Sequence, residues 1–142
     1  GPWRLDGAVD YTFEAGTTIG SGGRLIVVGF DPVSEVSRLN GFVSAYGTGP
    51  LAAGIDIVGP WSGNLSNASE RLALEKPQMP DLPGDSVSWV IVDEVIYADV
   101  SPWPASADGQ GDVLQRLSSD RYDCGNDPTN WRAASPTPGK KP

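Results

Sequence analysis

The sequence predicts an all-β fold, a sandwich of short strands with one short helix. Its 18 glycines and 13 prolines lie between short apolar runs and not in one low-complexity block, which is typical of many strands joined by turns. Only one segment, residues 32–46, has apolar residues at helical spacing. A chain of 142 residues is long enough for one domain with a hydrophobic core.

The N-terminal part of the chain predicts short strands around the helical segment. Residues 3–5 and 11–13 have strand character, and the glycine-rich stretch 16–23 is turn material. Residues 24–30 form an apolar run bounded by glycines and an Asp-Pro pair, which predicts a buried strand. In residues 32–46 the apolar spacing predicts one or two helical turns, with Pro32 in the first turn.

The C-terminal part contains the longest β-prone run, residues 87–97. This run is apolar on both faces, so we expect a strand that lies centrally in the sheet or is covered on both sides. The stretch 76–85 holds three prolines and is predicted to be a loop. The remaining predicted elements are short strands at residues 55–58, 70–74, 113–117 and 130–133, followed by a proline-rich basic tail or linker at 135–142.

The formal net charge of −8 limits the classes of partner. An acidic surface repels phosphate backbones and anionic membranes, so we expect no nucleic acid partner. No apolar run reaches the length of a transmembrane helix, so no membrane insertion is predicted. The single cysteine, Cys124, cannot form a disulfide within the chain, and its role is left open.

Carboxylates are the remaining candidates for catalysis, because the chain has no histidine. Asp93 and Glu94 are adjacent in the predicted strand, so they point to opposite faces and cannot act as a pair on one substrate. We expect one of them to meet a basic partner or a sheet edge. Asp108 and Asp112 could offer oxygen ligands to calcium, but a turn between strands is favoured. The sequence therefore predicts that the protein is not an enzyme and uses no cofactor. Whether a calcium ion binds at this turn is left open.

Five tryptophans in a small β domain are compatible with a carbohydrate-stacking surface. Trp61 and Trp103 lie in proline-containing loops and Trp131 lies near the end, so these three are the candidate binding residues. Packing in the core or at a corner is the favoured alternative for them. Trp89, inside the apolar run, is predicted to be a core residue.

Two glycosylation sequons begin at Asn64 and Asn67. They are relevant only in a eukaryotic secretory host, and whether they are glycosylated is left open. The alternative is that Ser66, Asn67 and Ser69 shape the turn before Glu70.

Several stretches together resemble the bacterial lamin-tail domain, and they cover nearly the whole chain in the family's order. They are W-R-L at 3–5, Y-T-F at 11–13, G-P-W-S-G-N-L-S-N at 59–67, E-R-L at 70–72, V-D-E-V-I-Y at 92–97, P-W-P at 102–104, A-D-G at 107–109, L-Q-R at 114–116 and N-D-P-T-N-W-R-A at 126–133. The resemblance implies an immunoglobulin-like β-sandwich over residues 1–134 that has no catalytic residues. It also implies an extracellular or cell-surface location.

One departure from the family pattern concerns the start of the chain. The family begins with a strand-like segment before the tryptophan that matches Trp3, and this segment is absent here. A sandwich without it would leave an unpaired edge or an open core face. We expect the gap to be filled either by a separate chain through strand addition or by rearranged local segments. The leading expectation for function is a structural or adhesive interaction module that contacts its own copies or another protein. The alternative is a polysaccharide-binding module that uses Trp61, Trp103 or Trp131.

Overall fold

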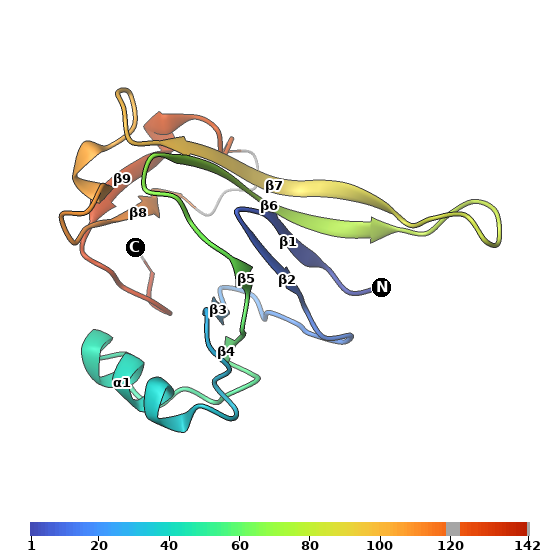
Figure 1. Cartoon of the computed structure of the whole chain (residues 1–142), viewed down its shortest axis with the longest axis horizontal. Coiled ribbons are helices and arrows are strands. Elements are labelled where there is room, and N and C mark those ends of the chain that lie inside the picture. The colour runs from blue at the N-terminus through green and yellow to red at the C-terminus, as the bar shows by residue number, and fades with distance from the viewer. Residues whose placement is uncertain (119–122, 142) are drawn as a thin grey trace.

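A computed structural model describes residues 1–118 and 123–141. It is mostly β with one short helix, which confirms the predicted all-β class. The main sheet is antiparallel and has the strand order β5-β2-β1-β6-β7. Two further pairs, parallel β3-β4 and antiparallel β8-β9, lie to one side of it (Figure 1). The strands are β1 (Arg4–Gly7), β2 (Val9–Thr12), β3 (Ile26–Val27), β4 (Ile57–Val58), β5 (Ser62–Gly63), β6 (Ser69–Gln78), β7 (Ser88–Ala98), β8 (Val113–Arg116) and β9 (Trp131–Ala134).

The β6-β7 hairpin projects beyond the rest of the sheet (Figure 1). The last residue of β6 that pairs with β1 is Glu75, opposite Arg4. Beyond this point β6 and β7 continue alone as a two-stranded arm, residues 76–90. The prediction of a loop from residue 76 is therefore wrong for residues 76–78, which belong to β6. Pro77 is tolerated there because, within residues 1–118 and 123–141, β7 is the only strand that pairs with β6 at this position.

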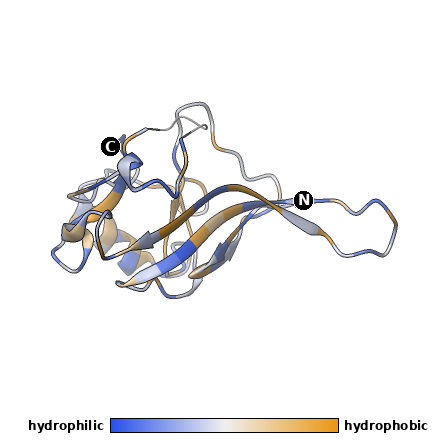
Figure 2. Ribbon diagram, turned by 90° about the horizontal axis from the view of Figure 1, so that it is seen from above, coloured by the Kyte–Doolittle hydropathy of each residue, from blue (hydrophilic) through white to orange (hydrophobic). Residues whose placement is uncertain are grey.

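The predicted central position of the long strand is wrong, because β7 lies at an edge of the sheet. Its apolar residues are not all covered: Ile91, Val92 and Ile96 are 51%, 45% and 51% exposed. An apolar run on both faces usually indicates cover on both sides. In β7, which is an edge strand, the same apolar run leaves apolar side chains exposed. Figure 2 shows such hydrophobic segments along the long strands of the projecting hairpin.

Helix α1 (Val36–Tyr46) spans eleven residues, so it is longer than the one or two turns predicted. It begins after Glu35 because Asp31 organises a separate turn before it. The Asp31 carboxylate accepts hydrogen bonds from the Val33 N–H and the Ser34 hydroxyl, and this turn places Pro32 outside the helix. The helix ends at Gly47, whose left-handed backbone (φ 57°) lets its N–H bond to the Val43 carbonyl.

The helix covers one small core. Val28, Phe30 and Ile57 are buried together, and Leu39 and Phe42 of α1 pack against them. Of the strand predicted at 24–30, only Ile26–Val27 (β3) forms, and it pairs in parallel with Ile57–Val58 (β4).

The described part of the C-terminal tail lies against the domain. The Gln115 side chain donates hydrogen bonds to the Ser135 carbonyl and the Thr137 hydroxyl. Further along, the Lys140 ammonium donates a hydrogen bond to the Gly47 carbonyl at the end of α1. These contacts hold the tail beside β8 and the helix.

The chain exposes more surface than its size requires. Its accessible surface is 8945 Å², whereas a folded protein of 14.9 kDa is expected to expose about 7000 Å². Large apolar side chains contribute to this excess at the arm (Met79, Leu82 and Val87) and along β7.

Candidate functional site

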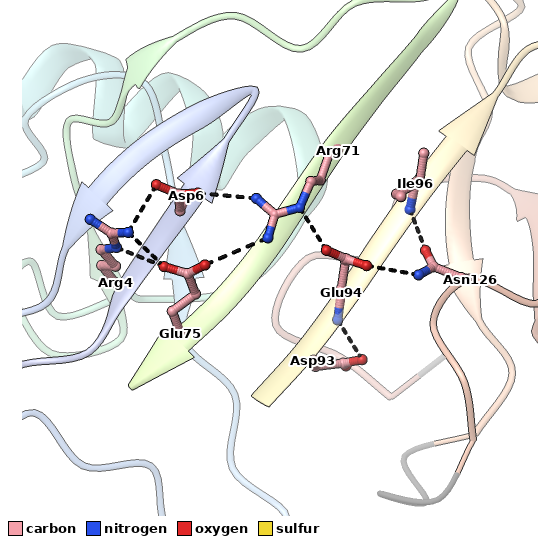
Figure 3. A network of polar contacts seen from close by, with 8 residues as sticks. All are labelled: Arg4, Asp6, Arg71, Glu75, Asp93, Glu94, Ile96 and Asn126. Atoms are coloured by element: carbon pink, nitrogen blue, oxygen red, sulfur yellow. Dashed lines mark hydrogen bonds and ion pairs between the residues drawn. The ribbon is translucent and has the colours of Figure 1, made fainter. Parts of the chain in front are cut away.

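The main sheet has two faces of opposite character, because alternate residues of a strand point to opposite sides. The side chains of the charged face are Arg4 and Asp6 from β1, Arg71 and Glu75 from β6, and Glu94 from β7 (Figure 3). The residues between them form the apolar face, with Leu5, Leu72, Leu74 and Val95. The apolar face looks toward the β8-β9 hairpin, and Trp131 and Arg116 of that hairpin complete the wall of a 130 Å³ cavity.

Arg71 is the centre of the charged face (Figure 3). Its guanidinium lies 2.6 Å from Glu94 Oε2, 3.0 Å from Asp6 Oδ2 and 3.5 Å from Glu75 Oε1. Arg4 completes the network at 2.7 Å from Glu75 and 3.2 Å from Asp6. The network joins three strands, and the buried carboxylate of Glu75 forms ion pairs with both Arg4 and Arg71. Its carboxylates therefore act as cross-strand ties.

Asp93 and Glu94 point to opposite faces, as the sequence predicts. Glu94 accepts hydrogen bonds from Arg71 and from the Asn126 side chain on the charged face. Asp93 pairs with Arg116 on the opposite face and so ties β8 to the sheet. Both carboxylates have basic partners, which extends the expectation that one of them would.

The pKa of Glu94 is lowered below its ordinary value of 4.5, chiefly by the hydrogen bond from Arg71 and then by that from Asn126. A carboxylate with a lowered pKa stabilises the fold above its unfolded pKa, and this stabilisation is lost as the pH falls through the folded pKa. We expect Glu94→Gln to flatten the pH dependence of the unfolding free energy over the acidic range in which the pH falls through the unfolded and then the lower folded pKa of this group. Urea titrations at a series of pH values measure this, with Asp85→Asn in the exposed arm as the control. Equal slopes for the two variants would contradict the assignment.

Among the described residues, only the C-terminal half of the outer edge of β7 is covered. There the Ile96 N–H donates to the Asn126 side chain, and the Glu94 N–H donates to the side chain of Asp93. Gly125 is buried against the Glu94 carbonyl, and a Cβ at this position would overlap that oxygen. The segment 124–126 therefore occupies the edge of β7 opposite residues 94–96.

The N-terminal half of the same edge, residues 88–91, is open. We call it the open edge. Within the described ranges, its backbone has hydrogen-bond partners only on β6. The extra residue Val92 separates it from the covered half, since Asp93 pairs with Leu74 and Ile91 with Glu75. The open edge has the sequence S-W-V-I and carries no charge. Charges on edge strands commonly protect them from pairing with other chains, and this protection is missing here.

The three predicted binding tryptophans do not form one platform. Trp103 is buried at 9% exposure and contacts Trp131, with ring centroids 6.3 Å apart and planes inclined by 48°. The Trp131 indole N–H donates to the Gly125 carbonyl. Trp61 is half-buried against Gly29 and makes no ring contact with the other two among the described residues. Polysaccharide binding through these side chains stays a prediction.

A cleft of about 430 Å³ lies between the apolar face and the β8-β9 hairpin. Its walls include Leu72, Val95 and Tyr97 of the sheet and Leu114 and Trp131 of the hairpin. Asp108 and Asp112, the candidate calcium ligands, line it together with Asp99. Sequence reasoning missed this cleft because its residues come from distant segments, although the alternation in β6 and β7 does place Leu72, Val95 and Tyr97 on one face.

The sequon residues lie in the loop between β5 and β6. Asn64 and Asn67 are exposed. The Ser66 hydroxyl accepts a hydrogen bond from the Ala68 N–H, and the Ser66 carbonyl accepts one from the Tyr97 hydroxyl. Ser66 therefore shapes the turn that leads into β6, which agrees for this residue with the alternative to glycosylation. Cys124, beside the covered edge of β7, is exposed.

These features define an all-β domain with a projecting hairpin, a partly open strand edge and an apolar cleft. In the described ranges, no group of three histidine, cysteine or acidic residues is placed to hold a metal ion. No helix in the same ranges has the length and apolar character needed to cross a bilayer. No protein-family model, curated protein or solved structure matches the chain.

Proposed function

We propose that this chain is a non-catalytic structural or adhesive module of a secreted or cell-surface bacterial protein, and that it assembles with copies of itself through β7. The observation that carries the proposal is the open edge, an uncharged strand edge on a projecting arm. A free edge presents unpaired N–H and C=O groups, which another strand can satisfy by extending the sheet.

A second copy is the partner that suits this edge. Two identical strands can pair antiparallel about a twofold axis, so that each residue meets its symmetry mate or a close neighbour. The open edge carries no charge, so such pairing brings no like charges directly together. Exposed Ile91 and Val92 would be covered by their counterparts. The long-range repulsion from a net charge of −8 is largely screened at physiological salt.

The finer fold and the location rest on the sequence resemblance. We infer an immunoglobulin-like β-sandwich of the lamin-tail type over residues 1–134, in which the main sheet and the smaller strand pairs form the two layers. Support comes from the antiparallel main sheet and from the β8-β9 hairpin facing its apolar side. Modules of this type occur in bacterial secreted and surface proteins, which supports an extracellular or cell-surface location. Pairing of the ladder carboxylates with arginines supports a non-catalytic role.

The substitution Ile91→Lys tests the proposed assembly. Sedimentation velocity should show the mass of the native chain rising with concentration toward twice the monomer mass. Ile91→Lys should weaken the dimer at least about tenfold, because the twofold axis introduces the lysine twice into one interface. Val100→Lys, at an exposed valine just after β7, is the matched control and should leave the dimer unchanged. A monomer at all concentrations, or an equal response to both substitutions, would reject self-assembly through this edge.

A further inference from the structure

The cleft between the apolar face and the β8-β9 hairpin has a feature that self-assembly through β7 does not use. Its body is lined by Leu65, Leu72, Val95, Tyr97, Leu114 and Trp131. The smaller cavity shares Leu72, Val95 and Trp131 with it, so the two hollows have a common wall. A volume of about 430 Å³ lies within the range of small-molecule sites in proteins, which are also mostly apolar.

The charges at this cleft have one sign. Asp99, Asp108 and Asp112 line it, and none of its described lining residues is a lysine or an arginine. Within the described ranges these three carboxylates have no ion-pair partner. The carboxylates of the charged face, in contrast, are paired with arginines. An apolar hollow with unpaired carboxylates is complementary to a ligand that carries one apolar group and one positive charge.

We propose that this cleft binds a small organic cation, an amine whose alkyl or aryl group enters the apolar body while its ammonium group meets the aspartates. Tyr97 supports the shape of the site, because its hydroxyl is already held by the Ser66 carbonyl and its ring remains as a wall. Each methylene group that leaves water strengthens binding about fourfold. Each ion pair with an exposed carboxylate adds up to about fivefold.

Three probes with the same chain and different head groups test the proposal: octylammonium, 1-octanol and octanoate. Binding is followed by the amide chemical shifts of Val95, Tyr97 and Leu114 and by tryptophan fluorescence. Octylammonium should bind most tightly, and octanoate should bind at least about tenfold more weakly. Asp112→Asn should weaken octylammonium by up to about fivefold and leave octanol unchanged. Asp85→Asn, in the distant arm, should change neither.

A pair of alanine substitutions locates the site. Ala107 lines the cleft, and Ala105 is an exposed residue of the same short helical turn, η1 (Ala105–Ala107), outside the lining. Ala107→Phe should abolish binding of octylammonium and octanol, and Ala105→Phe should preserve both. Equal affinities for the three probes, or octylammonium binding that survives Ala107→Phe, would overturn the proposal. Tighter binding of an alternating Lys-Leu peptide at the same residues would assign the cleft to a protein partner and overturn the small-molecule assignment.

Discussion

Arg71→Ala is expected to lower the free energy of unfolding by about 2 kcal/mol or more. Its guanidinium contacts carboxylates on three strands, and the network's other arginine, Arg4, pairs with Glu75 and Asp6 and not with Glu94. Among the described residues, the substitution leaves Glu75 with Arg4 as its one charged partner, although the Glu75 side chain is only 7% exposed. Removing one partner of a buried ion pair is costly because the remaining charge stays desolvated. The Arg71 side chain is itself a third exposed, so the expected loss is below that of a fully buried pair.

The matched control is Arg38→Ala. Arg38 pairs with Glu35 at 3.1 Å, but both side chains are largely exposed and the pair spans one helical turn. Such pairs contribute a few tenths of a kcal/mol, and the Arg38 guanidinium also lies 5.1 Å from the centre of the Phe30 ring, so we expect at most about 1 kcal/mol of destabilisation. Urea unfolding of both variants measures the difference. Equal losses would show that the network adds nothing beyond an ordinary surface ion pair.

The network also bears on the proposed assembly, because its Arg4–Glu75 pair lies at the base of the arm and its Arg71–Glu94 pair joins β6 to β7 a few residues further into the sheet. Cross-strand ties of this kind hold β6 and β7 in register. Because the arm is already held in one register, pairing through its open edge would require little further loss of conformational entropy. The proposed pairing through β7 would therefore depend on the ion pairs of the charged face, although these ion pairs would not themselves contact the second copy.

The sequence correctly predicted β7 as a strand, but the central place predicted for it in the sheet is wrong. Strand character is local, because β-branched and aromatic residues in a short run favour extended backbone. Whether such a strand has one neighbour or two depends on segments far away in the chain. The apolar pattern of Ile91, Val92 and Ile96 is typical of a covered strand, yet these residues are about half exposed. The apolar pattern predicts that these side chains are covered, but it does not indicate whether the covering segment belongs to the same chain.

Local chemistry was predicted better than long-range arrangement. The opposite orientations of Asp93 and Glu94 follow from alternation alone, and the structure confirms them. The start of α1 was misplaced because the side-chain hydrogen bonds of Asp31 compete with helix formation, and the apolar spacing does not register them. The cleft depends on contact between the sheet and β8-β9, so no local pattern identifies it.

Gly125 lies where the chain covers part of the β7 edge that the proposed assembly would use. The residue lies against the Glu94 carbonyl at the point where the chain crosses the edge of β7, and it leaves no room for a Cβ. The φ of Gly125 is not in the left-handed region. Glycine is therefore required there by the close approach of its backbone to the Glu94 carbonyl and not by its backbone conformation. The neighbouring Asn126 then reaches both the Ile96 N–H and Glu94. The segment 124–126 can cover this half of the edge because residue 125 has no Cβ.

Gly125→Ala should therefore have two effects at once. Displacement of the segment 124–126 should lower the free energy of unfolding by about 2 kcal/mol, because the new methyl group overlaps backbone atoms that cannot rotate away. The same displacement removes the cover from residues 94–96 and lengthens the open edge, so self-association should become stronger than in the native chain.

The matched control for Gly125→Ala is Gly20→Ala, at a loop glycine with free space around its Cβ position and no positive φ. It should change stability by no more than about 0.5 kcal/mol and leave association unchanged. Urea unfolding and sedimentation velocity on both variants separate the two effects. A destabilised Gly125→Ala protein that associates no more strongly would show that the cover over residues 94–96 does not limit pairing. An open edge that dimerises in the native chain would then be confined to residues 88–91 by the extra residue at Val92, which bends the strand at that point.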